Sequence, residues 1–101
     1  MTIKLTDTEC QTALTTLSGW SKAADREAIT QSFTFKNFSQ AWGIMTQIAL
    51  AAERLNHHPE WFNVYNRVDI TLTTHDANGV SQKDIRLAQT IDTIVATLEK
   101  A

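Results

Sequence analysis

Apolar and polar residues alternate with two different periodicities along the chain, and these divide it into seven predicted elements. In three stretches an apolar residue recurs at every third or fourth position, which predicts helices over about residues 7–18 and 37–55 and from Ser81 onward. In two stretches between them, 19–36 and 61–74, apolar and polar residues alternate, which predicts two strands in each. The predicted order is helix, strand, strand, helix, strand, strand, helix.

Short polar signals mark where the helices begin and end. Each predicted helix starts with a residue that can cap the backbone, followed three positions later by a partner: Thr6 and Glu9, Asn37 and Gln40, Ser81 and Asp84. Gly19 and Pro59 follow the first two helices, as residues that end helices commonly do. These local signals agree with the boundaries that the periodicity predicts.

The order of elements predicts an α+β fold, a two-layer sandwich of helices against an antiparallel sheet. Val68, Ile70 and Leu72 share one face of the last strand and are expected to point into the core. No linker, repeat or low-complexity segment interrupts the 101 residues. We therefore expect a single domain over residues 1–101.

The long helix carries a wider apolar face than one core needs. Its apolar positions cover roughly half of the helix circumference, whereas a stripe of roughly 100° is enough to face a single core. Ile44 and Ala51 lie on the shoulder that widens this stripe. We expect a helix–helix interface here; the alternative is that the sheet and a neighbouring helix of the same chain cover the whole face.

Composition and charge narrow the range of partners. Eleven acidic residues against nine basic ones leave the chain slightly negative, which removes the usual attraction to nucleic acid and to anionic lipid. The single cysteine, Cys10, cannot form an internal disulfide, and no stretch has the pattern of an export signal or a membrane span. The expectation is a cytoplasmic protein without direct nucleic-acid or membrane contact.

The three histidines occupy one short region of the chain. His57 and His58 lie between the long helix and the second strand pair, and His75 lies at the end of that pair. Because a hairpin returns the chain to the neighbourhood of its start, His75 is expected to approach the other two. Imidazoles titrate near neutral pH and can act together as acid and base. The alternative is that each is a surface or packing residue.

Two other features bear on this chemistry. Three imidazoles could instead hold zinc, but adjacent residues such as His57 and His58 point to opposite sides of an extended segment, which disfavours a metal site. Asp84 is expected to cap the last helix and could also orient an imidazole, as could Glu53, one turn before the histidine pair. Both roles stay open for each carboxylate.

The remaining motifs mostly exclude function classes. Trp20 and Trp42 are expected in the core, whereas Trp61, close after the histidine pair, could help to wall a flat heterocycle. The sequence contains no glycine-rich phosphate loop, nucleophile elbow or paired CxxC motif. Nucleotide chemistry and covalent serine or cysteine chemistry therefore lack support.

Long ordered segments closely resemble the pterin-4a-carbinolamine dehydratase family. The resemblance is carried by residues 53–66, 68–75 and 83–88, and it extends upstream through Gly19, Trp20 and residues 33–38. It implies a four-stranded antiparallel sheet with three helices on one face. It also implies dimers or tetramers joined through the long helices, which predicts an oligomer interface at Ile44, Ile48, Ala51 and Leu55.

The implied reaction is loss of water from a 4a-hydroxytetrahydropterin, giving the quinonoid dihydropterin that a reductase recycles after aromatic amino-acid hydroxylation. The resemblance implies no metal and no organic cofactor, because imidazoles can carry both protons. The natural pterin side chain is left open. A second implied function is that of an interaction module, since animal relatives bind the dimerisation helices of a transcription factor through the long helix.

The resemblance also assigns residues to the site. It implies that His57, His58 and His75 are catalytic, with Asp84 supporting them, and that Glu53 and Trp20 support the site from further away. The remaining positions expected to border the pterin are Asn56, Pro59, Trp61, Thr73, Thr74 and Asp76. Asn56 is often an aspartate in relatives, so its contact is the least secure. Which histidine is the acid and which the base stays open.

Overall fold

The elements of the chain appear in the predicted order. The computed structural model describes residues 2–100, with side chains through Leu98. The helices are α1 (Asp7–Leu14), α2 (Phe38–Leu55) and α3 (Gln82–Ala96), and the strands are β1 (Ser21–Lys22), β2 (Ile29–Thr34), β3 (Glu60–Val64) and β4 (Arg67–Leu72). Two short 3₁₀ turns, η1 (His75–Ala77) and η2 (Thr97–Lys100), precede and follow α3. The predicted α+β class is confirmed.

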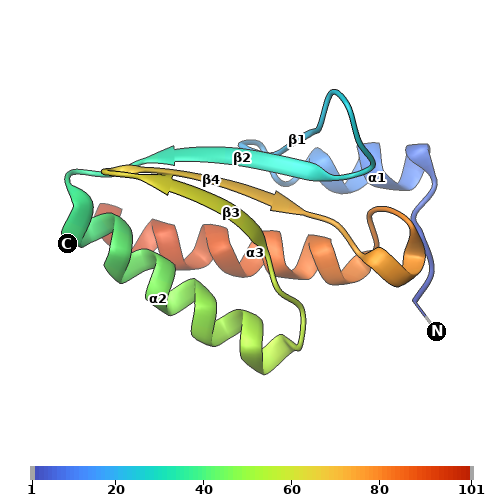
Figure 1. Ribbon diagram of the computed structural model, residues 1–101. Coiled ribbons are helices and arrows are strands. Elements are labelled where there is room, and N and C mark those ends of the chain that lie inside the picture. The colour runs from blue at the N-terminus through green and yellow to red at the C-terminus, as the bar shows by residue number, and fades with distance from the viewer. Residues whose placement is uncertain (1, 101) are drawn as a thin grey trace.

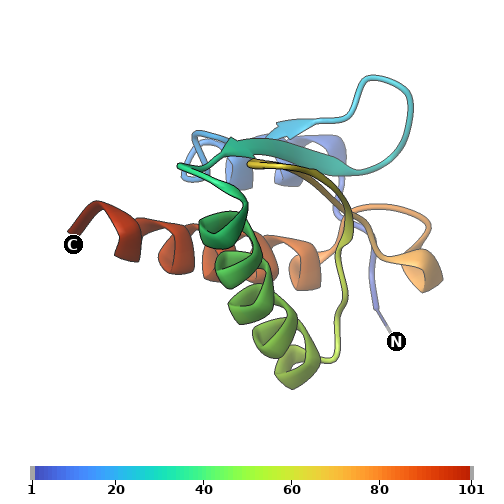
Figure 2. The same ribbon diagram turned by 60° about the vertical axis from the view of Figure 1, so that its left-hand side comes forward.

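The four strands form one antiparallel sheet in the order β1-β2-β4-β3. Val68, Ile70 and Leu72 of β4 are buried, as their alternation predicts, and they form the centre of the core. α2 and α3 lie side by side across this face of the sheet, while α1 lies beside β1 (Figures 1 and 2). Side chains from α1, α2 and α3 enter the same core.

The first helix is shorter than the periodicity predicts. It ends at Leu14, and the chain continues to Leu17 in turns closed by backbone bonds between residues three apart. The hydroxyls of Thr15 and Thr16 donate to the carbonyls of Thr12 and Ala13 at 2.6 and 2.9 Å. Such local bonds compete with the α-helical pattern, which accounts for the early end.

The predicted oligomer interface on α2 is wrong in most of its residues. Ile44, Ile48 and Ala51 are no more than 2% exposed, so a second chain cannot reach them. The sheet and α3 cover them within the chain. Leu55 is only partly buried against the same core, and for this residue alone the interface stays a prediction. The large exposed apolar side chains of α2 are instead Phe38, Trp42 and Leu50, at 49%, 57% and 60%. The expected position of Trp42 in the core is therefore wrong.

The length and composition of the helices bear on membrane insertion. Across residues 2–100, no helix combines the length and the apolar character needed to cross a bilayer.

Candidate active site

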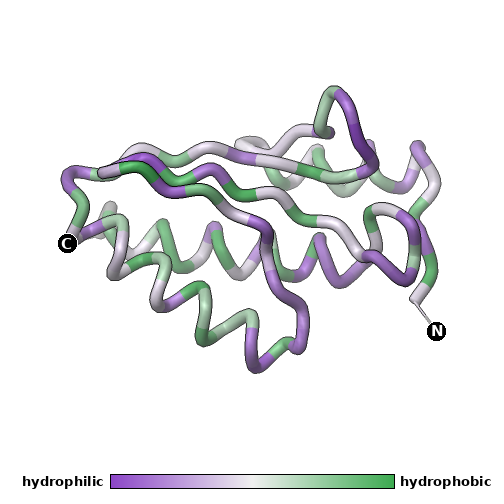
Figure 3. The backbone as a smooth tube through the Cα atoms, in the orientation of Figure 1, coloured by the Kyte–Doolittle hydropathy of each residue, from purple (hydrophilic) through white to green (hydrophobic). Residues whose placement is uncertain are grey.

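The cavity that gathers the histidines lies at one end of the sheet. The link from α2 to β3 and the turn after β4 both come to this end (Figure 1), and the link is a hydrophilic stretch (Figure 3). The cavity has a volume of about 440 Å³, within the usual range for small-molecule sites. Its lining residues are Asn56, His57, His58, Pro59, Glu60, Thr73, Thr74, His75, Asp76 and Lys83.

The end of α2 sets the direction of the histidine pair. Asn56 adopts the left-handed conformation, with φ 52° and ψ 42°. The backbone N–H of His57 donates to the carbonyl of Ala52, and that of Asn56 to the carbonyl of Glu53, each at 3.1 Å. These two bonds form a Schellman motif, which satisfies carbonyls at the helix end and reverses the chain. Asparagine tolerates this conformation better than most residues.

His57 rests on a buried carboxylate. Its Nε2 lies 2.5 Å from Oδ1 of Asp84, and 11% of the His57 side chain is exposed. An ionised carboxylate only accepts hydrogen bonds, so Nε2 carries the proton of this bond. In the neutral imidazole the unprotonated nitrogen is then Nδ1, which is left as a proton acceptor.

The Asp84 carboxylate is completely buried and fully hydrogen-bonded. Besides His57, its Oδ2 accepts from the Thr74 hydroxyl at 2.8 Å and from the Ser81 backbone N–H at 2.9 Å. The Ser81 hydroxyl lies 2.7 Å from that of Thr74 and accepts from the Lys83 backbone at 3.2 Å. The predicted cap of α3 is therefore confirmed, and the same carboxylate also holds an imidazole. Burial of a charge is tolerated because each contact satisfies it.

His58 pairs with a different carboxylate. Its Nε2 lies 2.8 Å from Oε1 of Glu53, and the two side chains are 58% and 79% exposed. Glu53 does not line the cavity but contacts a residue that does. The two adjacent histidines line the same cavity, and each has its own acidic partner.

His75 begins η1 rather than extending β4, which ends at Leu72. Its Nε2 lies 3.7 Å from Oε2 of Glu60, the first residue of β3, and 86% of the side chain is exposed. The Arg26 guanidinium holds the pKa of the Glu60 carboxyl below its ordinary value, chiefly by hydrogen bonding, with the charges of Arg26 and His75 as smaller contributions. Glu60 is therefore ionised at neutral pH.

Comparison with known proteins now adds to this geometry. Residues 3–94 match the family model described as pterin 4 alpha carbinolamine dehydratase. The chain belongs to the pterin-4a-carbinolamine dehydratase family.

Relatives from Brucella support this membership over nearly the same span. Proteins of Brucella ovis and Brucella canis, whose names assign them provisionally to the pterin-4-alpha-carbinolamine dehydratases, are 57% identical over 91 residues, covering 90% of this chain and 94% of theirs. A crystal structure from Brucella melitensis, described as a transcriptional coactivator/pterin dehydratase, superimposes with a TM-score of 0.88 at 57% identity. The match covers 90% of this chain and 97% of that one.

Some residues that the family resemblance implied lie away from the cavity. Trp61 lies in β3 opposite Ile70 and does not line the cavity. Trp20 is buried in the core, and its indole Nε1 donates to Asp92 of α3 at 2.9 Å. Trp20 belongs to the core and Trp61 packs against it, while the roles expected of them at the site stay predictions.

Glu60 and Lys83 line the cavity, and the sequence interpretation did not place either one there. Glu60 follows Pro59 directly, so its nearness to the histidine pair was a usable signal. Lys83 enters because α3 begins beside the turn that carries His75. Its position depends on how these elements pack, which no local pattern reveals.

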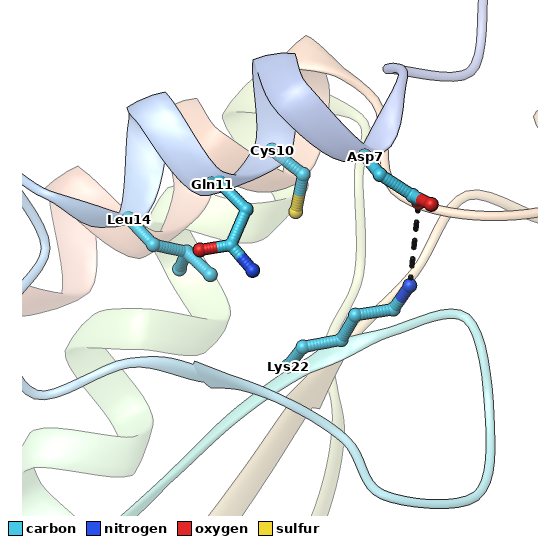
Figure 4. A pocket seen from close by; sticks show the side chains of 5 residues that line it. All are labelled: Asp7, Cys10, Gln11, Leu14 and Lys22. Carbon is cyan, nitrogen blue, oxygen red and sulfur yellow. Dashed lines mark ion pairs between the residues drawn. The ribbon is translucent and has the colours of Figure 1, made fainter.

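A second, smaller pocket lies between α1 and β1 and offers a different chemistry. It has a volume of about 170 Å³ and is lined by Asp7, Cys10, Gln11, Leu14 and Lys22 (Figure 4). Burial raises the pKa of the Cys10 thiol, which disfavours the reactive thiolate. Lys22 pairs with Asp7 at 3.5 Å (Figure 4). This pocket holds no imidazole.

Within the described part of the chain, no group of three or more histidine, cysteine, aspartate or glutamate side chains is arranged to hold a metal ion. The histidines of the cavity are instead paired separately with Asp84, Glu53 and Glu60.

Proposed function

We propose that this chain removes water from a 4a-hydroxytetrahydropterin, giving the quinonoid dihydropterin, by proton transfer between histidine side chains and without a metal or organic cofactor. The observation that carries the proposal is the cavity of about 440 Å³ that His57, His58 and His75 line together. Membership of the pterin-4a-carbinolamine dehydratase family supports the substrate class and the hydro-lyase reaction.

The reaction requires two proton transfers. The 4a hydroxyl accepts a proton and leaves as water, while the neighbouring ring nitrogen loses its proton and forms a double bond to carbon 4a. The proton count is balanced, so one acid and one base suffice. Histidine as a residue type suits both roles, because an unperturbed imidazole gains and loses a proton close to neutral pH.

His57 suits the part of the base in this scheme. Its Nε2 donates a hydrogen bond to Oδ1 of Asp84 at 2.5 Å, which leaves Nδ1 to take up the proton of the pterin ring nitrogen. The Asp84 carboxylate then stabilises the imidazolium that results. His58 or His75 then protonates the leaving hydroxyl. Both are exposed, so they exchange protons with water and are ready for the next cycle.

Residues at the ends of β4 and α2 complete the proposed pterin site. Thr73, Thr74 and Asp76 line the cavity where the chain leaves the sheet, and Asn56 and Pro59 line it from the α2–β3 link. Backbone groups at such a strand end can bind the amide edge of a flat ring. In the cell, the proposed role is recycling of the pterin in the cytoplasm after aromatic amino-acid hydroxylation.

Stopped-flow dehydration of a synthetic 4a-hydroxytetrahydropterin tests the proposal. Protein dialysed against a chelator is expected to accelerate the reaction well above its uncatalysed rate, and addition of zinc is expected to change nothing. A rate equal to the uncatalysed one would contradict the dehydratase function. Loss of activity on chelation, with recovery on zinc addition, would favour the metal-site alternative instead.

We also propose that the chain forms homodimers or homotetramers through an apolar groove on α2. This α2 groove, of about 250 Å³, is lined by Trp42, Met45, Thr46, Ala49, Leu50 and Trp61. Phe38 stacks on Trp42 at its edge, with ring centroids 6.3 Å apart. Exposed apolar patches of this kind commonly mark interfaces.

Sedimentation of the wild type and a Trp42→Glu variant tests this association. The wild type is expected above the monomer mass and the variant at it, while Gln47→Glu, an exposed change on the same helix outside the groove, should leave the mass unchanged. A monomeric wild type would contradict self-association. That result would favour the alternative of a groove for the helix of another protein, a role consistent with the coactivator description of the Brucella melitensis relative.

A further inference from the structure

An ion pair joins the cavity wall to a loop that the proposed chemistry does not use. The loop between β1 and β2 comes to the same end of the sheet as the cavity (Figures 1 and 2). From this loop Arg26 donates through Nη1 to Oε1 of Glu60 at 2.6 Å and through Nη2 to Oε2 at 3.0 Å. Two parallel bonds between a guanidinium and a carboxylate fix the orientation of both groups. Glu60 is thereby held in one position at the cavity wall.

A second contact holds the loop to the segment that follows β4. The Thr73 hydroxyl donates to the backbone carbonyl of Glu27 at 2.8 Å. Within the loop, the backbone N–H of Ala23 donates to the carbonyl of Ala28 at 2.9 Å. Both outside anchors, Glu60 and Thr73, line the cavity. The loop is therefore attached to β3 and to the segment that follows β4, and both carry residues of the cavity lining.

The Glu60 carboxylate is shared between Arg26 and His75. Its Oε2 atom accepts from Arg26 and lies 3.7 Å from Nε2 of His75, a distance that permits charge interaction but is too long for a hydrogen bond. A nearby negative charge favours the protonated imidazole, and the positive charge of Arg26 opposes this effect. The ion pair thus presents His75 with a partly neutralised carboxylate.

We propose that Arg26 is a positioning residue of the active site, which holds Glu60 beside His75 and prevents it from closing into a direct ion pair with that imidazole. The inference rests on the proposed function, because it matters for catalysis only if His75 transfers protons. A residue that gives and regains a proton must reach both protonation states, and a carboxylate shared with a guanidinium favours the protonated imidazole less than a free carboxylate does.

Other charged and titratable groups line the same cavity as His75. Asp76 is its neighbour in η1, Lys83 comes from α3, and His57 and His58 come from the α2–β3 link. Because these groups stay unchanged in variants of Arg26 and Glu60, a cycle of single and double substitutions isolates the ion pair.

The test is the protonated fraction of His75 at pH 6.5, measured from its imidazole NMR signals in Arg26→Gln, Glu60→Gln and the double variant. Arg26→Gln frees the carboxylate and should raise the ratio of protonated to neutral His75, by about two- to five-fold for an exposed pair. Glu60→Gln leaves an unpaired guanidinium and should lower the ratio. The double variant removes both charges and should return close to the wild-type ratio.

A matched control separates this effect from a general loss of surface charge. Arg67 makes a similar two-point pair with Asp69, at 3.0 and 2.7 Å, and lines no part of the cavity. Arg67→Gln should leave the His75 ratio unchanged. If both single variants shift the ratio in one direction, or neither shifts it, the proposal is overturned. A purely structural anchor would behave in this way, since the two losses would then be equivalent.

The dehydration assay distinguishes failure of this inference from failure of the proposed function. Arg26→Gln should move the pH–rate profile to higher pH by roughly 0.3 to 0.7 unit. This shift is the logarithm of the two- to five-fold change expected in the ratio of protonated to neutral His75. If the wild type dehydrates the pterin and the profile of this variant does not move, Arg26 does not position the site. A wild type without dehydratase activity contradicts the proposed function, and the NMR cycle then still decides whether the ion pair controls His75.

Discussion

The two sides of the histidine cavity are built differently. On the buried wall (His57, Thr74, Ser81 and Asp84), His57 is 11% exposed and Asp84 is completely enclosed, with three hydrogen bonds to its carboxylate. On the exposed rim (His58 and His75 with Glu53 and Glu60), the two imidazoles are 58% and 86% exposed. Each side offers imidazole and carboxylate, but in opposite surroundings.

The difference separates the tasks of holding and exchanging protons. On the buried wall, a polar group that loses its partner has no water to bond with instead. A substitution there therefore changes the geometry of the site, the stability of the fold and the activity together. On the exposed rim water replaces a lost partner, and surface ion pairs contribute little to stability. We therefore expect substitutions on the buried wall to lower the free energy of unfolding, and substitutions on the exposed rim to alter mainly the turnover.

The largest effect is expected from Asp84→Ala. The substitution leaves the side chains of His57 and Thr74 without their shared acceptor, and removal of one partner from a buried pair costs about 3–5 kcal/mol. Urea unfolding measures this loss of the free energy of unfolding. The control is Asp76→Ala on the exposed side of the cavity, expected within about 0.5 kcal/mol of the wild type. Equal stability of the two variants would show that the wall is no different from the rim.

His58→Ala comes next and should affect turnover without affecting folding. Loss of one acid–base group is expected to lower the dehydration rate about 10²-fold, equivalent to about 2.7 kcal/mol in the barrier. Because the side chain is 58% exposed, the free energy of unfolding should change by no more than about 0.5 kcal/mol. Unchanged turnover in the folded variant would remove His58 from the proposed catalysis.

A smaller effect is expected at Asn56, the residue that directs His57 to the wall and His58 to the rim. Its left-handed backbone disfavours alanine, so Asn56→Ala should lose about 1 kcal/mol of stability. Asn56→Gly, which accepts this conformation freely, should lie within a few tenths of a kcal/mol of the wild type by unfolding. If glycine destabilises as much as alanine, the backbone conformation is not what matters there.

The smallest effect is expected from loss of the Arg26–Glu60 pair on the exposed rim, and it depends on pH. Arg26 holds the pKa of Glu60 below its ordinary value of 4.5, so the unfolded chain binds more protons there than the folded one. This pair therefore stabilises the fold above pH 4.5 and loses its effect as the pH falls further. Arg26→Gln should lower the urea midpoint slightly at pH 7 and progressively less as the pH falls below 4.5. A difference that grows in acid would contradict this sign.

The sequence predicts those parts of the site that depend on local pattern. Ser81 and Asp84 are three positions apart, so the cap of α3 is visible before any tertiary contact is known. The return of His75 towards the other histidines follows from the hairpin between them. The choice between two roles for Asp84 could not be made from the sequence, because its bond to His57 spans 27 positions. One carboxylate fills both roles.

Tertiary packing decides what the sequence left undetermined. Apolar residues lie on both the inner and the outer face of α2, so periodicity cannot tell that Ile48 is buried while Trp42 is exposed. The pair of Arg26 and Glu60 joins residues 34 positions apart, and neither belongs to a periodic pattern. The early end of α1 was detectable in principle, because consecutive threonines weaken a helix.

The central claim is that the three imidazoles face one bound pterin, and titration of an unreactive pterin into protein with isotopically labelled histidines tests it directly. The imidazole signals of His57, His58 and His75 should all shift, with one shared dissociation constant. Binding of the pterin without a shift in any of the three signals would contradict it.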